Sequence, residues 1–455
     1  MDQTIRVNVT QMGGQPNGDP NRTQMGVAPG QTVMGGYAPM GSGPTLSLSV
    51  RVSNSLAAAG ERTRGHILTQ LTAGQGGGAG GRRMPVNVAL VIDRSGSMEG
   101  APLEYVKRAC AHVVDQLSSD DVLSIVTFEE SVDVLMPARR VTDRELIKQH
   151  IQRIVPGNTT NLFDGLYAGG AQLASVPDLN GYVTRILLLT DGEPTAGLKD
   201  FTSITNQVAD LKNRGISVTA LGFGPEYNEE LMAGIARRSG GNYYYIERPE
   251  QIPDVFRKEM ESVLGVTAKN IQLTLSLPRF TTVRQCFGSP PNFAARTASI
   301  ALPDIERGST VTKLWEVDFE PRPAAIYRVA KAILSYDDGA TGMRETIIQN
   351  ITVEFVVDSS VVASGADPLV AQELAVVQAG RDLERTMMGM RTQQLSTADL
   401  TAALNRTQQM LHQQGRAAEA QEVAQAAAAA SRGDADSIEK TLIGTIYHLD
   451  LGKRS

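Results

Sequence analysis

The sequence predicts an α/β fold, a doubly wound and mainly parallel sheet, inserted in a flanking antiparallel β-sandwich and followed by a C-terminal helical region. Three observations indicate this arrangement. Short apolar runs alternate with amphipathic segments through 85–264, which is typical of a parallel sheet covered by helices on both faces. Apolar residues alternate with polar ones between turn signals in 265–360, as in antiparallel strands. Helix-forming Ala, Gln, Leu and Met dominate 361–455, where Gly and Pro are sparse.

Composition limits the class of protein. The chain has 455 residues, 41% of them apolar, and a formal net charge of −6, so several domains are expected and no basic field favours nucleic acid or an anionic membrane. Two cysteines, Cys110 and Cys286, exclude a disulfide framework and suit a reducing compartment. The first residues lack the plan of a signal peptide, and no run of eighteen apolar residues occurs. We therefore expect a soluble cytoplasmic protein.

Residues 1–43 are expected to form a disordered tail, because they are rich in Gly, Pro and Met and show no helical or strand period. A Thr-x-Met-Gly motif recurs there at Thr10, Thr23 and Thr32. One hypothesis is that a Ser/Thr kinase modifies these threonines for a phosphothreonine-binding domain. The motif could instead be recognised unmodified, or be an accidental similarity within a Met-rich tail.

The remaining elements follow in order. Residues 44–84 hold a strand at 46–53 and a Gly-rich linker at 74–81. This strand has no partner nearby, so we expect it to join the sandwich completed by 265–360, which makes the α/β unit an insertion. The expected strands of the α/β unit are 86–93, 121–128, 184–191, 217–224 and 242–247, and those of the later sandwich segment are 271–277, 314–319, 327–336 and 346–357. Helices are expected near 368–390, 397–413, 416–431 and 435–446, as a bundle without chemistry of its own.

Oxygen-bearing side chains gather where the strands of the α/β unit end. The strand 86–93 runs into Asp93, Ser95 and Ser97, and the strand 184–191 ends on Asp191. Thr160 lies on a loop before a helix. Because ligand sites in parallel sheets form at the carboxyl ends of strands, we expect these five side chains to converge.

The donor set contains hydroxyls and carboxylates but no imidazole or thiolate. Hard oxygen ligands select Mg²⁺, Mn²⁺ or Ca²⁺ over zinc or copper. With few full charges and small side chains, an octahedral Mg²⁺ that retains some waters is the first expectation. Two other interpretations stay open: a domain whose metal site is degenerate, and simple helix capping by Asp93 and Ser95.

The turn Asp93-x-Ser95-x-Ser97, together with Thr160 and Asp191-Gly192, resembles the metal-ion-dependent adhesion site (MIDAS) of von Willebrand factor A (VWA) domains. The order of strands and helices is similar to the Rossmann-like, doubly wound fold of that family. The resemblance implies that the two serines ligate a metal directly, that the threonine often does so, and that the carboxylates act directly or through water. It also implies that a partner carboxylate completes the coordination sphere. All five positions match the family's pattern.

The sequence favours a binding module or scaffold over an enzyme. Five histidines are scattered over the expected modules, and HExxH, GxSxG and CxxC motifs are absent. Two alternatives stay open: a metal-dependent hydrolase that uses the same site, and a structural VWA protein with a non-functional site. The resemblance to prokaryotic cytoplasmic VWA proteins implies a role as a scaffold or cofactor for AAA+ ATPases or in Ser/Thr kinase signalling.

Overall fold

The computed structural model describes residues 45–75, 83–224 and 227–454. The expected tail and its threonines, and most of the Gly-rich linker, lie outside these residues. The described part contains no helix that is both long and apolar enough to cross a membrane.

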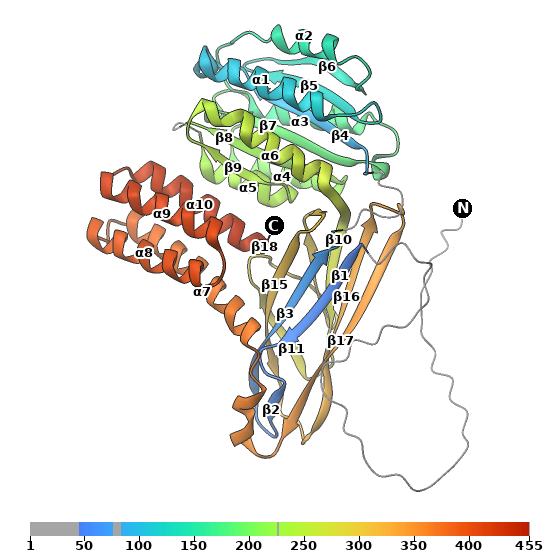
Figure 1. The fold of residues 1–455 in the computed structure, drawn as a ribbon, viewed down its shortest axis with the longest axis vertical. Helices are drawn as coiled ribbons and strands as arrows, with labels where there is room; N and C mark the ends of the chain where they lie inside the picture. Colours follow the sequence, from blue (N-terminus) through green and yellow to red (C-terminus); the bar gives the residue numbers. More distant parts are fainter. Residues whose placement is uncertain (1–44, 76–82, 225–226, 455) are drawn as a thin grey trace. The chain divides into compact units, whose positions relative to one another are not determined.

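The α/β unit is built on a six-stranded sheet (Figure 1). All neighbouring strands are parallel apart from one edge strand, so the prediction of a mainly parallel sheet is confirmed. The strands, in spatial order, are β6 (Val132–Arg140), β5 (Val122–Phe128), β4 (Val86–Asp93), β7 (Val183–Thr190), β8 (Ile216–Phe223) and β9 (Tyr243–Ile246).

Helices cover both faces of this sheet, because successive side chains of each central strand point to opposite faces. Val88 and Leu90 of β4 belong to a core with α1, α2 and α6, whereas Ala89 and Val91 belong to a second core with α3, α4 and α5. The first group comprises α1 (Ala101–Gln116), α2 (Arg144–Gln152) and α6 (Ile252–Gly265), and the second α3 (Leu162–Ala174), α4 (Phe201–Asn213) and α5 (Glu229–Ser239). Short 3₁₀ turns occur at η1 (Gly96–Met98), η2 (Leu179–Gly181) and η3 (Pro249–Gln251).

The β-sandwich is assembled from segments on either side of the α/β unit. Its first sheet runs β1 (Leu46–Val52), β3 (Thr63–Ala73), β15 (Thr310–Phe319) and β11 (Thr281–Cys286), and β18 (Lys453–Arg454) also pairs with β15. Its second sheet runs β12 (Asn292–Ala294), β13 (Thr297–Leu302), β10 (Val266–Ser276), β16 (Ala325–Asp338), β17 (Arg344–Val356) and β2 (Leu56–Ala58), and β14 (Ile305–Glu306) pairs with β10.

The pairing of β1 with β3, and of β3 with β15, confirms that the α/β unit is an insertion in the sandwich. Trp315 from one sheet and Leu273 from the other lie in one shared core, and both are fully buried. The pairs are antiparallel, as predicted, with one exception: β2 runs parallel to β17. Figure 1 shows the blue strands β1 and β3 beside the later strands of the same sandwich.

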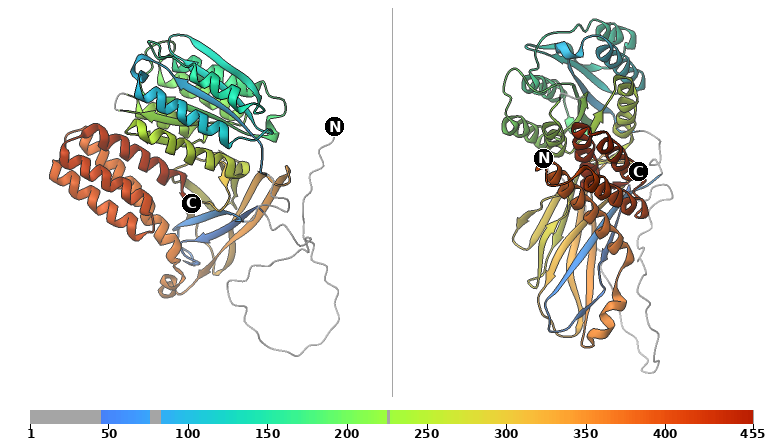
Figure 2. Two further views of the ribbon diagram at one scale, coloured as in Figure 1. Left: turned by 45° about the horizontal axis from the view of Figure 1, so that its top comes forward. Right: turned by 90° about the vertical axis from the view of Figure 1, so that its left-hand side faces the viewer.

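Four helices lie near the end of the described chain, as predicted, and β18 follows the last of them. They are α7 (Pro368–Arg391), α8 (Thr397–Gln413), α9 (Ala417–Arg432) and α10 (Ala435–Leu451), preceded by the 3₁₀ segment η4 (Ser359–Gly365). Leucine and alanine side chains form their common core. Figure 2 shows the four helices side by side in two further views. The last helix also contacts the α/β unit, where the Tyr447 hydroxyl donates a hydrogen bond to the carbonyl of Gly241.

Candidate metal site

The candidate site lies at the carboxyl edge of the central sheet. Asp93 is the last residue of β4 and Asp191 directly follows β7. Because these strands are parallel neighbours, with Ile92 beside Leu189, their ends lie at the same edge. The chain after β4 turns through η1 into α1, and the amide of Gly96 donates to the carbonyl of Asn158, which ties this turn to the loop that carries Thr160.

The two serine hydroxyls converge on one carboxylate oxygen. Ser97 Oγ donates to Asp191 Oδ1 at 2.9 Å, and Ser95 Oγ lies 3.4 Å from the same atom. The two hydroxyl oxygens are 3.1 Å apart. Two hydroxyl oxygens from the turn after β4 and one carboxylate oxygen from the residue after β7 therefore form a compact cluster, in which Ser95 and Asp191 are almost fully buried.

The Asp93 carboxylate is fully buried and fixed in place by two donors. Its Oδ1 accepts from the amide of Ser95 at 2.8 Å, and its Oδ2 accepts from the hydroxyl of Thr190. Burial raises the pKa of Asp93 to about 6, the neighbouring charge of Asp191 adds to this rise, and the two donors oppose it. A cation at this edge would offset the cost of burying the charge.

Thr160 lies beside the turn after β7. Its amide donates to Thr195 Oγ1 at 2.9 Å, and its carbonyl accepts from the amides of Thr195 and Ala196. A Cβ atom added to Gly192 would be 3.8 Å from Thr160 Oγ1. The loop after β7 thus holds Thr160 next to Asp191.

The residues present fit a hard divalent cation. The described residues contain no group of three or more His, Cys, Asp or Glu side chains that could hold a metal, so any ion here would depend on hydroxyls together with two carboxylates. That donor chemistry suits Mg²⁺, Mn²⁺ or Ca²⁺. The structure brings Ser95, Ser97 and Asp191 into direct contact and places Asp93 and Thr160 at the same edge. Their role as metal ligands stays a prediction.

Further carboxylates lie on residues close in sequence or in hydrogen bonding to the turns that carry the candidate ligands. Arg94 pairs with Glu129 at 3.3 Å and with Asp133 at 2.9 Å. The pKa of Glu129 is lowered to about 2, first by the backbone amide of Glu130 and then by further donors that include Ser131 and the amide of Asn158. Glu193 is exposed, and its Oε1 lies 3.4 Å from the side-chain Nδ2 of Asn228, which donates to it. The five histidines lie away from this edge, in β3, α1, α2, α8 and α10.

Sequence reasoning missed Thr190, Thr195 and Asn161, which position the candidate ligands. Asn161 caps α3 by accepting from the amide of Asp164, and its side chain would be 2.2 Å from a Cβ at Gly197. Of these three residues, only Thr190 could have been noticed in the sequence, because it is a polar residue at the end of an apolar run.

Comparisons with known proteins agree with the fold. The family model of the von Willebrand factor type A domain matches residues 87–258. An uncharacterized protein of Synechocystis sp. is 34% identical over 197 residues, which are 43% of this chain and 46% of that protein. The uncharacterized protein YfbK of Escherichia coli is 28% identical over 253 residues, which are 54% of this chain and 44% of that protein. The matched segment thus spans less than half of either relative.

A solved structure has the same fold over most of the chain. The von Willebrand factor type A protein from Catenulispora acidiphila superposes with a TM-score of 0.70 at 18% identity, over 85% of this chain and 91% of that one. At this identity the likeness concerns the fold alone. The family match, the sheet order and the helices on both faces together show that this chain contains a von Willebrand factor type A domain.

Proposed function

We propose that this protein is a scaffold that binds a partner protein through a divalent cation held at a MIDAS. The ligands would be Asp93, Ser95, Ser97, Thr160 and Asp191, and Mg²⁺ is the preferred ion, with Mn²⁺ or Ca²⁺ as substitutes. The observation that carries the proposal is the convergence of two serine hydroxyls on Asp191 Oδ1, beside the buried carboxylate of Asp93.

The arrangement suits binding of an acidic side chain. A bound cation would supply an electrophilic centre for a carboxylate of the partner. Two carboxylates and three hydroxyls would hold the ion together. Two of these groups have fixed positions, because Thr190 fixes Asp93 and the loop after β7 fixes Thr160. The partner therefore would contribute an Asp or Glu side chain. Nucleic acid and membranes are not proposed as partners, given the net charge of −6.

We propose a non-enzymatic role for this site. A hydrolase would need a general acid or base within hydrogen-bond reach of a metal-bound reactant. The five histidines lie elsewhere in the fold, and Glu193, the exposed carboxylate nearest in sequence to Asp191, lies beside Asn228. This geometry favours binding over the hydrolase that the sequence left open.

Metal binding is tested with Mn²⁺ as the probe. Titration of the full chain with Mn²⁺, followed by electron paramagnetic resonance, should show one site whose affinity falls about tenfold or more in Ser97→Ala, because one ligand is lost. Ser47→Ala, an exposed serine in β1, is the matched control and should bind as the wild type does. Equal Mn²⁺ affinity in all three proteins would reject the metal site.

Partner binding is tested separately. The immobilised protein is incubated with an extract of its native host in Mg²⁺ and in EDTA, and retained proteins are quantified. Retention of the partner should require Mg²⁺ and be lost in Ser97→Ala, while Ser47→Ala retains it. A partner retained equally in EDTA would contradict the metal-dependent mechanism even if Mn²⁺ binds.

We also propose that the tail motif at Thr10, Thr23 and Thr32 is recognised by a Ser/Thr kinase or a phosphothreonine-binding domain, in a kinase-linked or AAA+ ATPase-linked complex in the cytoplasm. The threefold repetition of the motif supports recognition, and the two free, buried cysteines suit a reducing compartment. Mass spectrometry of the protein from its native host tests modification. Unmodified threonines under every growth condition would remove the phosphorylated form of this proposal.

A further inference from the structure

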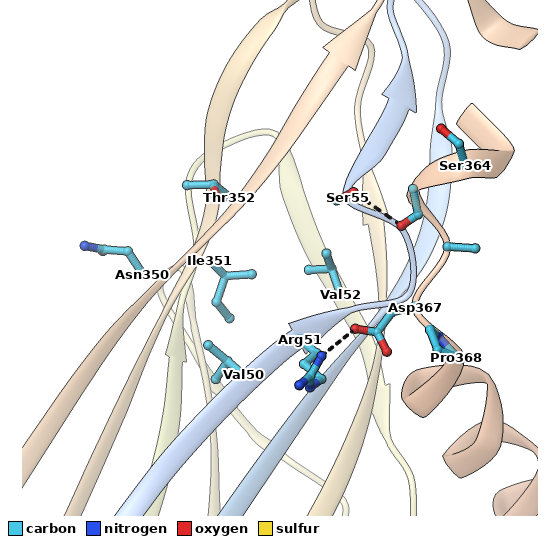
Figure 3. Close-up of a pocket in the computed structure, with 12 residues that line it drawn as sticks. Val50, Arg51, Val52, Ser55, Asn350, Ile351, Thr352, Ser364, Asp367 and Pro368 are labelled. Carbon is cyan, nitrogen blue, oxygen red and sulfur yellow. Dashed lines mark hydrogen bonds and ion pairs between the residues drawn. The ribbon is translucent and has the colours of Figure 1, made fainter. Parts of the chain in front are cut away.

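Two hollows in the described part of the structure differ in how their polar groups are satisfied. The wider one has a volume of about 490 Å³ and lies beside β1 (Figure 3). Its Arg51 pairs with Asp367 at 3.0 Å, and the hydroxyl of Ser55 donates to the carbonyl of Gly365 at 3.3 Å. The two charged residues of its lining therefore balance each other.

The narrower hollow lies at the amino edge of the central sheet, opposite the candidate metal site. Thr184 and Ser217, each the second residue of its strand, line it from β7 and β8. The end of α4 supplies Lys212, and β10 of the sandwich supplies Lys269. We refer to this hollow, between Thr184, Lys212 and Lys269, as the junction pocket, because the inserted α/β unit and the sandwich both line it.

The lining of the junction pocket carries an excess of positive charge. It contains three basic residues, Lys212, Arg214 and Lys269, and one acidic residue, Asp304. The carboxylate of Asp304 pairs with a further cation, Arg185, at 3.0 Å. Asp304 therefore cannot neutralise the lysines of the pocket, and the local field favours an anion.

Lys212 has the clearest need for an acceptor. Its ammonium group carries three N–H donors, yet among the described residues it has no hydrogen bond or ion pair. Burial lowers the pKa of Lys212, and the charge of Asp304 opposes this shift. A buried ammonium group without an acceptor costs free energy, and an anion beside it would supply the acceptor and the opposite charge together.

Lys269 and Thr184 each retain a donor for the same occupant. Lys269 Nζ donates to the carbonyls of Asn180 at 2.5 Å and Tyr182 at 2.6 Å, which leaves the third of its N–H groups. Thr184 is only 4% exposed, and its hydroxyl oxygen has no hydrogen-bond partner among the residues that the structure describes. Because buried hydroxyls are normally hydrogen-bonded, this one indicates a bound group that the chain itself does not provide.

The size of the pocket limits the occupant. Its volume of about 10 Å³ is just enough for one water molecule or a monatomic ion of similar size, and polyatomic anions such as sulfate are larger. We propose that the junction pocket binds one halide ion, chloride under ordinary conditions, held by Lys212, Lys269 and Thr184. The ion joins the inserted unit to β10 of the sandwich. This site is separate from the candidate metal site and does not depend on it.

Anomalous diffraction locates the ion. Crystals of the full chain are soaked in bromide, which is similar to chloride in size and charge and scatters X-rays anomalously. The expected result is one bromide peak within hydrogen-bond distance of Lys212 Nζ and Thr184 Oγ1. A junction pocket without such a peak would overturn the proposal, because it would then hold water or nothing.

Thermal unfolding tests binding in solution. Sodium chloride replaces sodium gluconate at constant ionic strength, so that only the anion changes. The unfolding temperature of the wild type should rise with chloride and level off as the site fills. Lys212→Met keeps the length of the side chain and removes its charge, so this rise should be lost. Lys199→Met, at an exposed position before α4, is the matched control and should retain it.

Thr184→Val tests the hydroxyl group. The change keeps the shape of the side chain and removes the donor, so the chloride concentration at half-saturation should increase about tenfold. Thr142→Val, at an exposed position, should leave that concentration unchanged.

Three results would contradict the halide site. The first is an equal response to chloride in the wild type and in Lys212→Met. The second is a bromide peak in the crystal without any difference between these two proteins in solution, which would identify an adventitious ion only. The third is a response to sulfate that depends on Lys212 and is as strong as the response to chloride, which would contradict the size limit.

Discussion

Thr190 is the residue that orients Asp93. Its hydroxyl donates to Asp93 Oδ2 while the amide of Ser95 holds Oδ1, so both carboxylate oxygens have fixed partners. Thr190 is almost fully buried, at 1% exposure. A carboxylate that is fixed in this way is ready to face a cation without first paying the entropy of ordering its own side chain.

Replacement of Thr190 by valine tests this role. The change keeps the shape of the side chain and removes the donor to Asp93. Because partners of metal ligands typically contribute 10–100-fold to metal affinity, Thr190→Val should weaken Mn²⁺ binding by roughly that factor. Thr142→Val, at an exposed position before α2, is the matched control. Titration calorimetry with Mn²⁺ decides, and unchanged affinity in Thr190→Val would refute the positioning role.

The sequence named five candidate ligands, whose role as ligands stays a prediction, but it did not name the residues that position them. Asp93, Ser95 and Ser97 lie in one short motif, and Asp191 ends a long apolar run. Thr190 and Thr195 act through single hydrogen bonds across loops, and such contacts leave no period or spacing in the sequence. The residue types at strand ends can therefore be interpreted from the sequence, but hydrogen-bond partners across loops can be identified only from the structure.

At the scale of elements, α3 packs against the sheet with three glycines among the leucines of its buried face. A Cβ at Gly169 would be 2.5 Å from Val91 Cγ2 of β4, and one at Gly165 would be 2.8 Å from the ring of Phe128. The side chain of Leu211 in α4 occupies the corresponding space at Gly170. α3 begins directly after Thr160 and Asn161, so the way in which α3 packs against the sheet helps to set the position of Thr160.

Gly169→Ala should therefore destabilise the protein although alanine favours helices. The added methyl group overlaps Val91, and overpacking of this kind costs about 1–3 kcal/mol. Gly380→Ala in α7 is the control, because its Cβ would meet Leu449 at an ordinary 3.8 Å and should leave stability equal or raise it by about 0.5–1 kcal/mol. Thermal unfolding measures both. A Gly169→Ala protein as stable as Gly380→Ala would contradict the packing argument.

The elements with the strongest patterns were predicted well. The apolar runs of β4, β5, β7 and β8 are each fully buried in the structure, and the four C-terminal helices lie where composition placed them. The sequence analysis did not identify β6, because most of its side chains are exposed and it carries a proline. It placed a helix after Thr160 without giving its bounds, and in the structure this helix is α3, whose buried face holds three leucines and three glycines. The missing signal of β6 thus has a physical cause.

At the scale of the whole described chain from Thr45 onward, a buried ion cluster joins the inserted domain to the sandwich. Arg185 of β7 pairs with Glu259 of α6 at 3.1 Å and with Asp304, just before β14, at 3.0 Å. Glu259 is fully buried and also accepts from Thr219, Asn242 and Tyr244. Lys269 of β10 adds hydrogen bonds to two carbonyls around η2. This part of the junction is polar, and each of these charges has a partner.

Arg185→Met should be strongly destabilising. It leaves Glu259 buried without its cation, and removal of one partner of a buried ion pair costs about 3–5 kcal/mol. Arg257→Met is the control. Arg257 lies on α6, as Glu259 does, and is an exposed arginine with two exposed partners, so its loss should change stability by no more than about 1 kcal/mol. Urea unfolding compares the two variants. Similar midpoints would show that the cluster does not hold the junction together.

The insertion also has a consequence for the order in which the chain is made. β1 and β3 are synthesised early, but β15, which pairs with β3, follows roughly 240 residues later. At about 5–20 residues per second, this hairpin waits between about 10 and 50 seconds for its neighbour. The inserted domain is contiguous and can complete its own sheet during that interval. The inserted domain is thus complete before the β-sandwich that contains it. The early hairpin of β1 and β3 is therefore the segment most in need of protection by chaperones during translation.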